Sequence, residues 1–347
     1  MSREFGFFPT GRLNAITDVP GVRVGHSTCA DPANRIFSGV TAIWPRSDVY
    51  TFRPRASGHV LHGAGEMTGL HQVLEWGVIE TPILLTSTLN VGRAYDSLIE
   101  YLAEKHPKMG ITEDVLIPVV AECDDSHLND ARARPVGKKE VRAALESAST
   151  GPVAEGGVGA GTGMVAFDFK GGIGTSSRKL KIGKKTYTLG ALVNANVGMR
   201  RQLRMAGYPL GRELQKKFLP HTMRKADRSI IVILATDAPL RPDQLRRISV
   251  RAGLGLGRSG SFAGHGSGEI ILAFSTMLGE PRDPKGPLMK VENLHDSFLN
   301  PFYEAAVECV EESVWKALVA GRDTIGRDGH RVFGIKSALS KRRSRSP

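Results

Sequence analysis

The sequence predicts a single α+β domain in which short buried strands alternate with amphipathic helices. Several short apolar runs are bounded by turn residues, and Ile230–Ala235 is the most pronounced of them. Runs of this length are typical of strands, since a buried helix needs about ten residues or more. Other segments carry apolar residues at helical spacing. No internal repeat and no linker divides the 347 residues into two cores, so one domain is expected.

The individual elements follow from these patterns in chain order. Residues 10–60 alternate short β-prone runs with turns, and residues 63–76 predict a helix with Met67, Leu70 and Leu74 on one face. Buried strands are expected at 82–85, 116–121, 188–196 and 270–274. Further helices are expected at 92–106, 138–147, 242–254 and 302–320. Residues 200–228 are poor in apolar side chains and predict a loop.

The stretch 227–240 is the most informative part of the sequence, because Ser229 stands directly before the most pronounced apolar run. The preceding charged segment, Met223–Arg228, has the composition of an exposed loop. One interpretation of Ser229 is an ordinary serine at a strand edge, satisfied by the backbone. The other is a nucleophile that cleavage of the chain before it would release.

Composition limits the classes of protein to be considered. Apolar residues make up 41% and charged residues 24%, as in ordinary globular proteins. The three scattered cysteines (Cys29, Cys123 and Cys309) are too few for a disulfide framework and predict a reducing, cytoplasmic compartment. The sequence has no long apolar stretch near its N-terminus and none approaching about eighteen residues, so neither a secretory signal nor a membrane span is expected.

The formal net charge of +12 raises the question of nucleic-acid binding. Five of the positive charges lie in residues 336–347, at Lys336, Lys341, Arg342, Arg343 and Arg345. This segment is low in apolar residues and predicts a disordered, solvated tail outside a domain of residues 1–335. Contact with RNA through the tail is the less favoured interpretation.

Several common active-site motifs are absent from the sequence. The glycine-rich segment Gly156–Gly163 lacks the G-x-G-x-x-G spacing, and no Walker motif occurs. There is no H-E-x-x-H pair or cysteine pair with metal-ligand spacing, and no G-x-S-x-G elbow. We therefore expect no nucleotide cofactor, no metal and no conventional serine-hydrolase triad.

An N-terminal serine nucleophile remains compatible with the sequence. Serine needs a base beside it, and cleavage before Ser229 would create an α-amine on the same residue. The ordinary pKa of such an amine is about 7.7–8.0, so a useful fraction is neutral near pH 7. Ser267 and Glu269 are two residues apart at a strand entrance and are predicted to share one face.

Six motifs resemble, in order, the DmpA-like L-aminopeptidase/D-esterase and β-peptidyl aminopeptidase family, peptidase family S58. They are NAITDVPGVRVGH at 14–26, PVVAE at 118–122, GGVGAGTGM at 156–164, ANVG at 195–198, SIIVILATDAPL at 229–240 and SGE at 267–269. The resemblance extends from about residue 10 to residue 335. Agreement of several motifs in order is much more specific than any one of them.

The resemblance implies a four-layer αββα sandwich and self-cleavage between Arg228 and Ser229, which would give an α-chain of 1–228 and a β-chain from 229. Ser229 would be the nucleophile, its α-amine the general base, and Ser267 with Glu269 a relay that orients the amine. Asn196 would donate to the oxyanion.

The implied substrate is a short peptide, amino-acid amide or ester with a free amine, on either an α- or a β-amino acid. Glu122 is expected to pair with the substrate ammonium, and His127 to donate a hydrogen bond nearby. The resemblance also implies a homotetramer of processed pairs and no cofactor. Two alternatives stay open: an amidase for other linear amides, and an uncleaved, inactive relative that binds small amines or nucleic acid. The related nylon-oligomer hydrolases and acetyl-transferring enzymes use threonine as nucleophile, so the serine here disfavours them.

Overall fold

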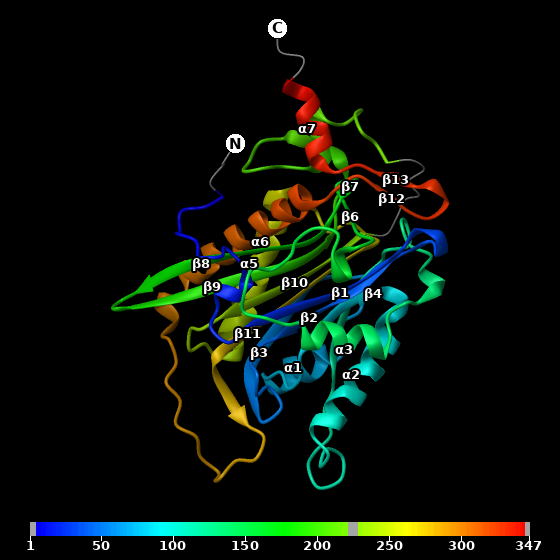
Figure 1. Ribbon diagram of the computed structural model, residues 1–347. Coiled ribbons are helices and arrows are strands. Elements are labelled where there is room, and N and C mark those ends of the chain that lie inside the picture. Colours follow the sequence, from blue (N-terminus) through cyan, green and yellow to red (C-terminus); the bar gives the residue numbers. More distant parts are fainter. Residues whose placement is uncertain (1–4, 221–227, 344–347) are drawn as a thin grey trace.

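The computed structural model describes residues 5–220 and 228–343, and these form four layers (Figure 1). The smaller sheet has the strand order β1-β2-β4-β5, with β1 at Arg23–Asp31, β2 at Ile36–Trp44, β4 at Ile83–Ser87 and β5 at Val119–Cys123. The larger sheet has the order β3-β11-β10-β9-β8, with β3 at Phe52–Gly63, β8 at Gly172–Ile182, β9 at Lys185–Asn196, β10 at Arg228–Thr236 and β11 at Ser267–Pro281. The predicted αββα fold is confirmed.

Helices cover the outer face of each sheet. The smaller sheet packs against α2 (Val91–Lys105) and α3 (Lys138–Glu146), and the larger against α5 (Pro242–Ser259) and α6 (Asn300–Ala320). The remaining elements are α1 at Leu70–Trp76, α4 at Leu210–Glu213, α7 at Ile335–Arg343, and two short pairs: β6 at Val165–Ala166 with β7 at Phe169–Lys170, and β12 at Thr324–Ile325 with β13 at Arg331–Val332.

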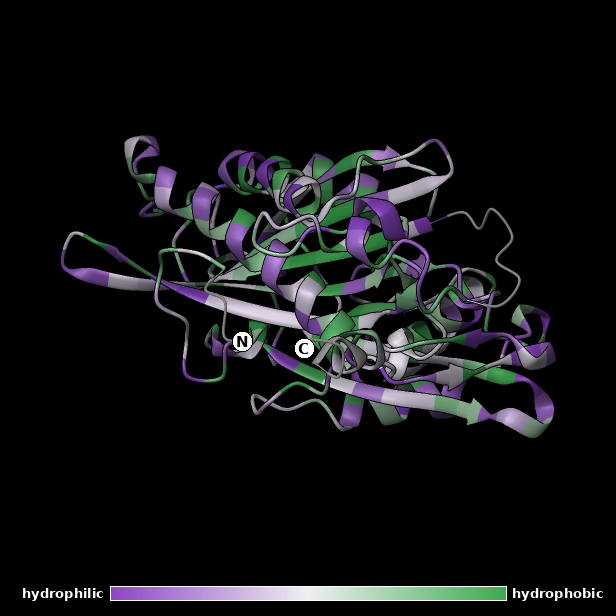
Figure 2. Ribbon diagram, turned by 90° about the horizontal axis from the view of Figure 1, so that it is seen from above, coloured by the Kyte–Doolittle hydropathy of each residue, from purple (hydrophilic) through white to green (hydrophobic). Residues whose placement is uncertain are grey.

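Strand β10 lies in the middle of the larger sheet and is buried on both faces, which explains its unbroken apolar run. Ile231 and Ile233 point into the core between the two sheets, where they meet residues of the smaller sheet such as Leu85. Ile230 and Val232 point the other way, into the core beneath α5 and α6. The central strands are accordingly among the most hydrophobic parts of the ribbon (Figure 2). By alternation, the Ser229 side chain faces the core between the sheets.

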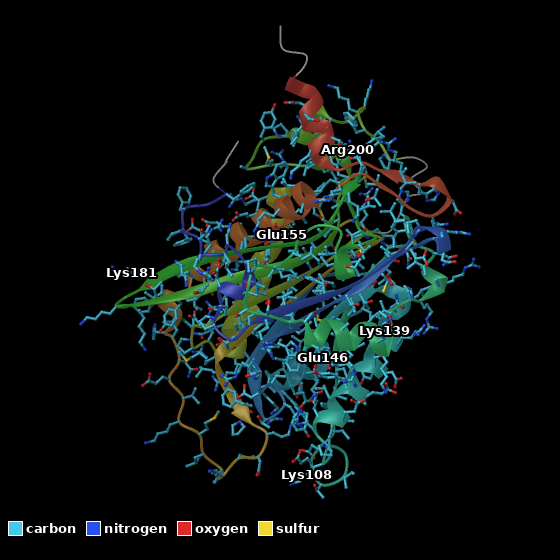
Figure 3. The ribbon with its side chains drawn as sticks, viewed as in Figure 1. Lys108, Lys139, Glu146, Glu155, Lys181 and Arg200 are labelled. Atoms are coloured by element: carbon cyan, nitrogen blue, oxygen red, sulfur yellow. The ribbon has the colours of Figure 1, made fainter. Side chains whose placement is uncertain are left out.

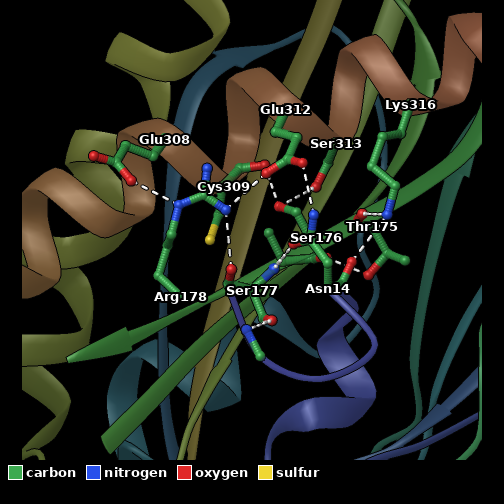
Figure 4. Close-up of polar contacts among 12 residues, drawn as sticks. Asn14, Thr175, Ser176, Ser177, Arg178, Glu308, Cys309, Glu312, Ser313 and Lys316 are labelled. Carbon is green, nitrogen blue, oxygen red and sulfur yellow. Dashed lines mark hydrogen bonds and ion pairs between the residues drawn. The ribbon is translucent and has the colours of Figure 1, made fainter. Parts of the chain in front are cut away.

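A buried ionic cluster joins β8 to α6 (Figure 4). The Arg178 guanidinium donates to Glu308 at 2.6 Å and to Glu312 at 2.7 Å. Phe7 donates its backbone N–H to Glu308 at 2.7 Å, and the Asn14 amide donates to Glu312 at 2.6 Å. The cluster therefore also fixes the N-terminal segment against the outer face of the larger sheet.

The structure confirms eight of the predicted elements with shifted ends, namely those near 82–85, 92–106, 116–121, 138–147, 188–196, 242–254, 270–274 and 302–320. The helix predicted over 63–76 is wrong for its first half. Strand β3 extends through Gly63 because it pairs there with β11, and α1 begins only at Leu70, after Gly69 with a φ of +71°. Leu74, expected on the buried face, is exposed.

Two other predictions need correction. Strand β8, which forms a hairpin with β9 and has Lys181 near the outer tip (Figure 3), was not predicted because it mixes glycine, serine and basic residues. The basic segment from 336 was expected to be disordered, but α7 spans Ile335–Arg343, with Ile335 and Ala338 buried against the core. These apolar contacts supply the burial that composition alone did not reveal. Residues 344–347 lie outside the described residues.

Residues 200–220 are also more ordered than the predicted loop, since they contain α4 and the buried Arg200, labelled in Figure 3. The Arg200 guanidinium donates to the backbone carbonyls of Phe167, Lys217 and Phe218 and thereby satisfies an irregular stretch of chain. Most of the predicted exposed segment before Ser229, residues 223–227, lies outside the described residues. Arg228 itself differs from that prediction, because it begins β10 and is half-buried.

Candidate active site

Ser229 is the second residue of β10 and lies between two neighbours in the sheet. It is paired with Asn196 of β9 on one side and with Gly268 of β11 on the other. Its hydroxyl is buried and has no hydrogen-bond partner. Cys123 at the end of β5 lies close to Ser229 on the opposite sheet, and burial raises the pKa of its thiol. An unpartnered buried hydroxyl is unusual, so Ser229 does not fit the interpretation of a strand-edge serine satisfied by backbone.

Ser267 and Glu269 form a buried pair next to Ser229 along β11. The Ser267 hydroxyl donates to Glu269 Oε1, while Glu269 Oε2 is buried without a partner. Burial raises the pKa of Glu269, and the hydrogen bond from Ser267 partly opposes that effect. Ile270 and Leu272 face the core between the sheets, so Ser267 and Glu269 take the alternate positions on the strand. In the uncut chain the pair therefore lies beside the backbone of Ser229, on the face away from its hydroxyl.

Asn196 ends β9 directly opposite Ser229. Its Oδ1 accepts from the Val165 N–H at 2.8 Å, and its Nδ2 donates to the Asp124 carbonyl at 3.0 Å. These two contacts fix the orientation of the amide, since Oδ1 must face the N–H donor. Nδ2 carries a second hydrogen, which remains for another acceptor. Asn196 is thus a preorganised donor beside the serine.

Glu122 lies at the end of β5 and is buried. Its carboxylate accepts from the Glu66 backbone N–H at 3.0 Å and from the Thr88 hydroxyl. Burial raises the pKa of Glu122, and both hydrogen bonds lower it. Gly65 packs between this carboxylate and Gly268, the residue paired with Ser229. The structure therefore brings Glu122 to the same end of the strands as Ser229, Asn196, Ser267 and Glu269.

His127 belongs to a neighbouring cluster. Its ring stacks on His330 with 5.0 Å between the ring centroids, and its carbonyl accepts from His330 Nδ1 at 2.8 Å. Burial, with smaller contributions from His330 and Arg327, lowers the pKa of His127 to about 4. The imidazole is therefore neutral near pH 7, and its Nε2 is buried without a partner.

Arg228, on the acyl side of the predicted cleavage site, is held by contacts that sequence reasoning missed. Its guanidinium donates to Asp168 Oδ1 at 2.5 Å and to the Gly198 carbonyl. Asp168 lies in the turn between β6 and β7, sixty positions away in the sequence. Neither Asp168 nor Cys123 carried a motif, and only the folded chain brings them to the site.

No metal centre or membrane span emerges from the described residues. In residues 5–220 and 228–343, no cluster of His, Cys, Asp or Glu side chains has the arrangement of a metal site. Within the same ranges, no helix is long and apolar enough to cross a bilayer.

A four-layer αββα fold with a buried serine at the start of its central strand defines an N-terminal nucleophile hydrolase. Residues 14–332 match the sequence profile of Peptidase family S58, so the chain belongs to that family. The resemblance inferred from the motifs is thereby confirmed, and the chain is a serine aminopeptidase of the N-terminal nucleophile type.

Individual relatives agree with this assignment over nearly the whole chain. The chain is 42% identical over 343 residues to the beta-peptidyl aminopeptidase BapA of Sphingosinicella xenopeptidilytica, covering 94% of this chain and 85% of the relative. The solved structure of a Burkholderia sp. beta-aminopeptidase is 42% identical with a TM-score of 0.90, covering 99% of this chain and 96% of the other. The l-aminopeptidase d-ala-esterase/amidase from Ochrobactrum anthropi, described as a variant of the Ntn hydrolase fold, is 39% identical with a TM-score of 0.89, covering 98% and 96%.

Proposed function

We propose that Ser229 cleaves its own chain and then serves as the nucleophile of an aminopeptidase for short substrates with a free amine. The observation that carries this proposal is the position of Ser229, between the fixed amide of Asn196 and the buried Ser267–Glu269 pair. The products would be an α-chain of residues 1–228 and a β-chain of 229–347 within one domain.

In the processing step, Ser229 Oγ attacks the carbonyl carbon of Arg228. A C–O bond forms, the C–N bond of the peptide breaks, and the amide nitrogen receives the proton that the hydroxyl gives up. Water then hydrolyses the ester, which leaves a carboxylate on Arg228 and an α-amine on Ser229. Arg228 suits this step because its side chain is anchored, so the scissile bond is held at both ends.

In substrate hydrolysis, the new α-amine of Ser229 takes the hydroxyl proton and later gives it to the leaving amine. Once the peptide bond is cut, this amine no longer belongs to the strand backbone and can turn toward Ser267. The hydroxyl of Ser267 and the carboxylate of Glu269 would then orient it and stabilise its protonated form.

Asn196 and Glu122 would act on opposite ends of the substrate's first residue. The free hydrogen on Asn196 Nδ2 would donate to the developing oxyanion, since the amide is already oriented by Val165 and Asp124. The Glu122 carboxylate would pair with the substrate ammonium, which confers the requirement for a free amine. His127 would line the acyl side as a neutral hydrogen-bonding group.

The names of the relatives support short peptides, amides or esters as the substrate class, with β-amino acids included. We further expect a homotetramer of processed pairs that needs no cofactor. Three free cysteines, two of them buried, support residence in the cytoplasm. Sedimentation of the processed protein would test the assembly directly.

The first experiment is the intact mass of purified wild-type protein beside Ser229→Ala. We expect the wild type to give pieces of 228 and 119 residues and the variant to remain whole. A panel of α- and β-aminoacyl amides, with N-acetylated versions as controls, then tests the aminopeptidase activity. A wild-type chain that stays intact and inactive would instead support an uncleaved binding protein, and equal cleavage of N-acetylated amides would support an amidase.

A further inference from the structure

The acyl side of the scissile bond occupies a preformed cation-binding subsite. Arg228 donates from one terminal nitrogen to Asp168 Oδ1 at 2.5 Å and from the other to the Gly198 carbonyl. Both side chains of the ion pair are about 15% exposed, so water screens the pair only partly. The subsite thus combines one carboxylate and one carbonyl, a pattern suited to a guanidinium or an ammonium.

The subsite is held in place by contacts that do not involve Arg228. Asp168 Oδ2 accepts from the Arg200 backbone N–H at 2.9 Å, and the Phe167 N–H donates to the Val197 carbonyl at 2.7 Å. Phe167 packs so closely against Gly198 that a Cβ there would meet its ring at 2.2 Å. Removal of the Arg228 side chain would leave the carboxylate in position.

The backbone that presents Asp168 is itself unusual. Phe167 and Asp168 have φ angles of +50° and +58°, in the two-residue turn between β6 and β7. Such turns favour glycine, asparagine and aspartate, and a phenylalanine there is strained. The strain is compatible with a turn that is shaped to hold a carboxylate at this point.

The Arg200 guanidinium also lies near the Asp168 carboxylate and interacts with it electrostatically, but it donates no hydrogen bond to that carboxylate. The Arg200 guanidinium is engaged by the backbone carbonyls of Phe167, Lys217 and Phe218. His127 lies near enough to Arg228 and Asp168 for their charges to affect its pKa, which is lowered to about 4, so its imidazole is neutral near pH 7. Within residues 5–220 and 228–343, departure of the Arg228 side chain would therefore leave the Asp168 carboxylate without a hydrogen bond from a charged side chain.

The chemistry of the proposed function links this subsite to substrates. During self-cleavage, the ester on Ser229 Oγ carries Arg228 as its acyl group. During turnover, the ester on the same oxygen carries the first residue of the substrate. Both esters join the acyl carbon to the same oxygen, Ser229 Oγ, so we expect their acyl groups to extend to the same side of the site.

We propose that Asp168 and the Gly198 carbonyl, once Arg228 has left, bind the side chain of the substrate's first residue and select basic residues there. This inference rests on the proposed function and adds a substrate class: amides and peptides that begin with arginine, lysine or their β-homologues. In this proposal Asp168 binds the cationic side chain of the substrate's first residue and does not touch the reacting atoms, so it determines specificity.

The test compares arginine amide with citrulline amide, which has the same shape without the charge, on processed wild type and on Asp168→Asn. Asparagine tolerates positive φ and can still accept from the Arg200 N–H, so the turn is retained. Rates are expressed per mole of free β-chain N-terminus, because the variant is also expected to process more slowly. We expect the wild type to prefer arginine over citrulline by roughly 10–100-fold in kcat/KM, the range for a hydrogen bond to a charged group, and Asp168→Asn to lose most of that preference. The deciding quantity is the ratio of arginine to citrulline within each protein, so a general loss of rate in the variant does not affect the comparison.

The outcomes separate the two proposals. If the wild type processes itself and hydrolyses neutral amides but does not prefer arginine, the specificity inference is refuted while the proposed function stands. A preference that persists in Asp168→Asn refutes it equally. If the wild type neither processes itself nor hydrolyses any amide, the proposed function fails and the subsite fails with it.

Discussion

Replacement of Arg178 by alanine should destabilise the fold by several kilocalories per mole. Arg178 and Glu308 are 2% and 1% exposed, and Arg178 donates to Glu308 at 2.6 Å (Figure 4). In Arg178→Ala, Glu308 would keep the Phe7 N–H but lose its cation and remain buried. Removal of one partner of a buried ion pair typically costs about 3–5 kcal/mol. Glu312 is 14% exposed and retains Asn14, so its contribution is smaller.

The assay is urea unfolding of the uncut chain, with Ser229→Ala as the common background so that one covalent species is measured. Arg142→Ala is the matched control, because Arg142 also pairs with two glutamates, Glu104 and Glu146, but at the surface. That change should cost much less than Arg178→Ala, because ion pairs exposed to water contribute little to stability. If Arg178→Ala and Arg142→Ala lower the free energy of unfolding by the same amount, the argument from burial is wrong.

Three further predictions concern the site and its surroundings. Asn196→Ala should lower kcat by about 10²–10³ with little change in KM, and an unchanged kcat in steady-state assays would remove it from the oxyanion site. Glu269→Gln should lower kcat and move the acid limb of the pH–rate profile to lower pH, because the α-amine that acts as base would lose the carboxylate that stabilises its protonated form. An acid limb at the wild-type pH would contradict this role. Asp125 is buried, and burial raises its pKa to about 7, so the native state holds a proton that the unfolded state loses above about pH 4. The contribution of Asp125 to the free energy of unfolding should therefore decrease as the pH rises from about 4 to 7. In urea titrations, Asp125→Asn should show a weaker decrease than the wild type over this range. An equal decrease in both proteins would contradict the argument.

Local patterns were sufficient to predict most of the elements that are uniformly apolar or clearly amphipathic, including strand β10 after Ser229. They also predicted the shared face of Ser267 and Glu269, because strand periodicity is a local property. They failed where pairing outweighed local preference. Strand β3 continues through Gly63 because β11 supplies hydrogen-bond partners there. The helical spacing of apolar residues that follows in the sequence had placed the start of a helix at residue 63.

Contacts between distant segments could not be predicted from local sequence patterns. Asp168 meets Arg228 only because the β6–β7 turn lies beside the end of β9. Cys123 meets Ser229 only because the two sheets stack with β5 over β10. Asp168 has no distinguishing neighbours in the sequence, and Cys123 follows the motif at 118–122 without belonging to it, so both contacts become visible only in the packed layers.

The strand order explains why cleavage before Ser229 would leave the architecture intact. The order β3-β11-β10-β9-β8 places β3 and β9, from the proposed α-chain, on either side of the β10–β11 pair from the proposed β-chain. Helix α6, also from the β-chain, covers β8 and β9 and is bound to β8 through Arg178. Separation of the pieces would break two strand ladders and expose both faces of the larger sheet, at a cost comparable to unfolding. The two chains should therefore co-elute after processing without a covalent link. The new α-amine would thus appear at the first residue of the central strand β10 after cleavage. The neighbouring strands β9 and β11 already hold Asn196, Ser267 and Glu269 in place there.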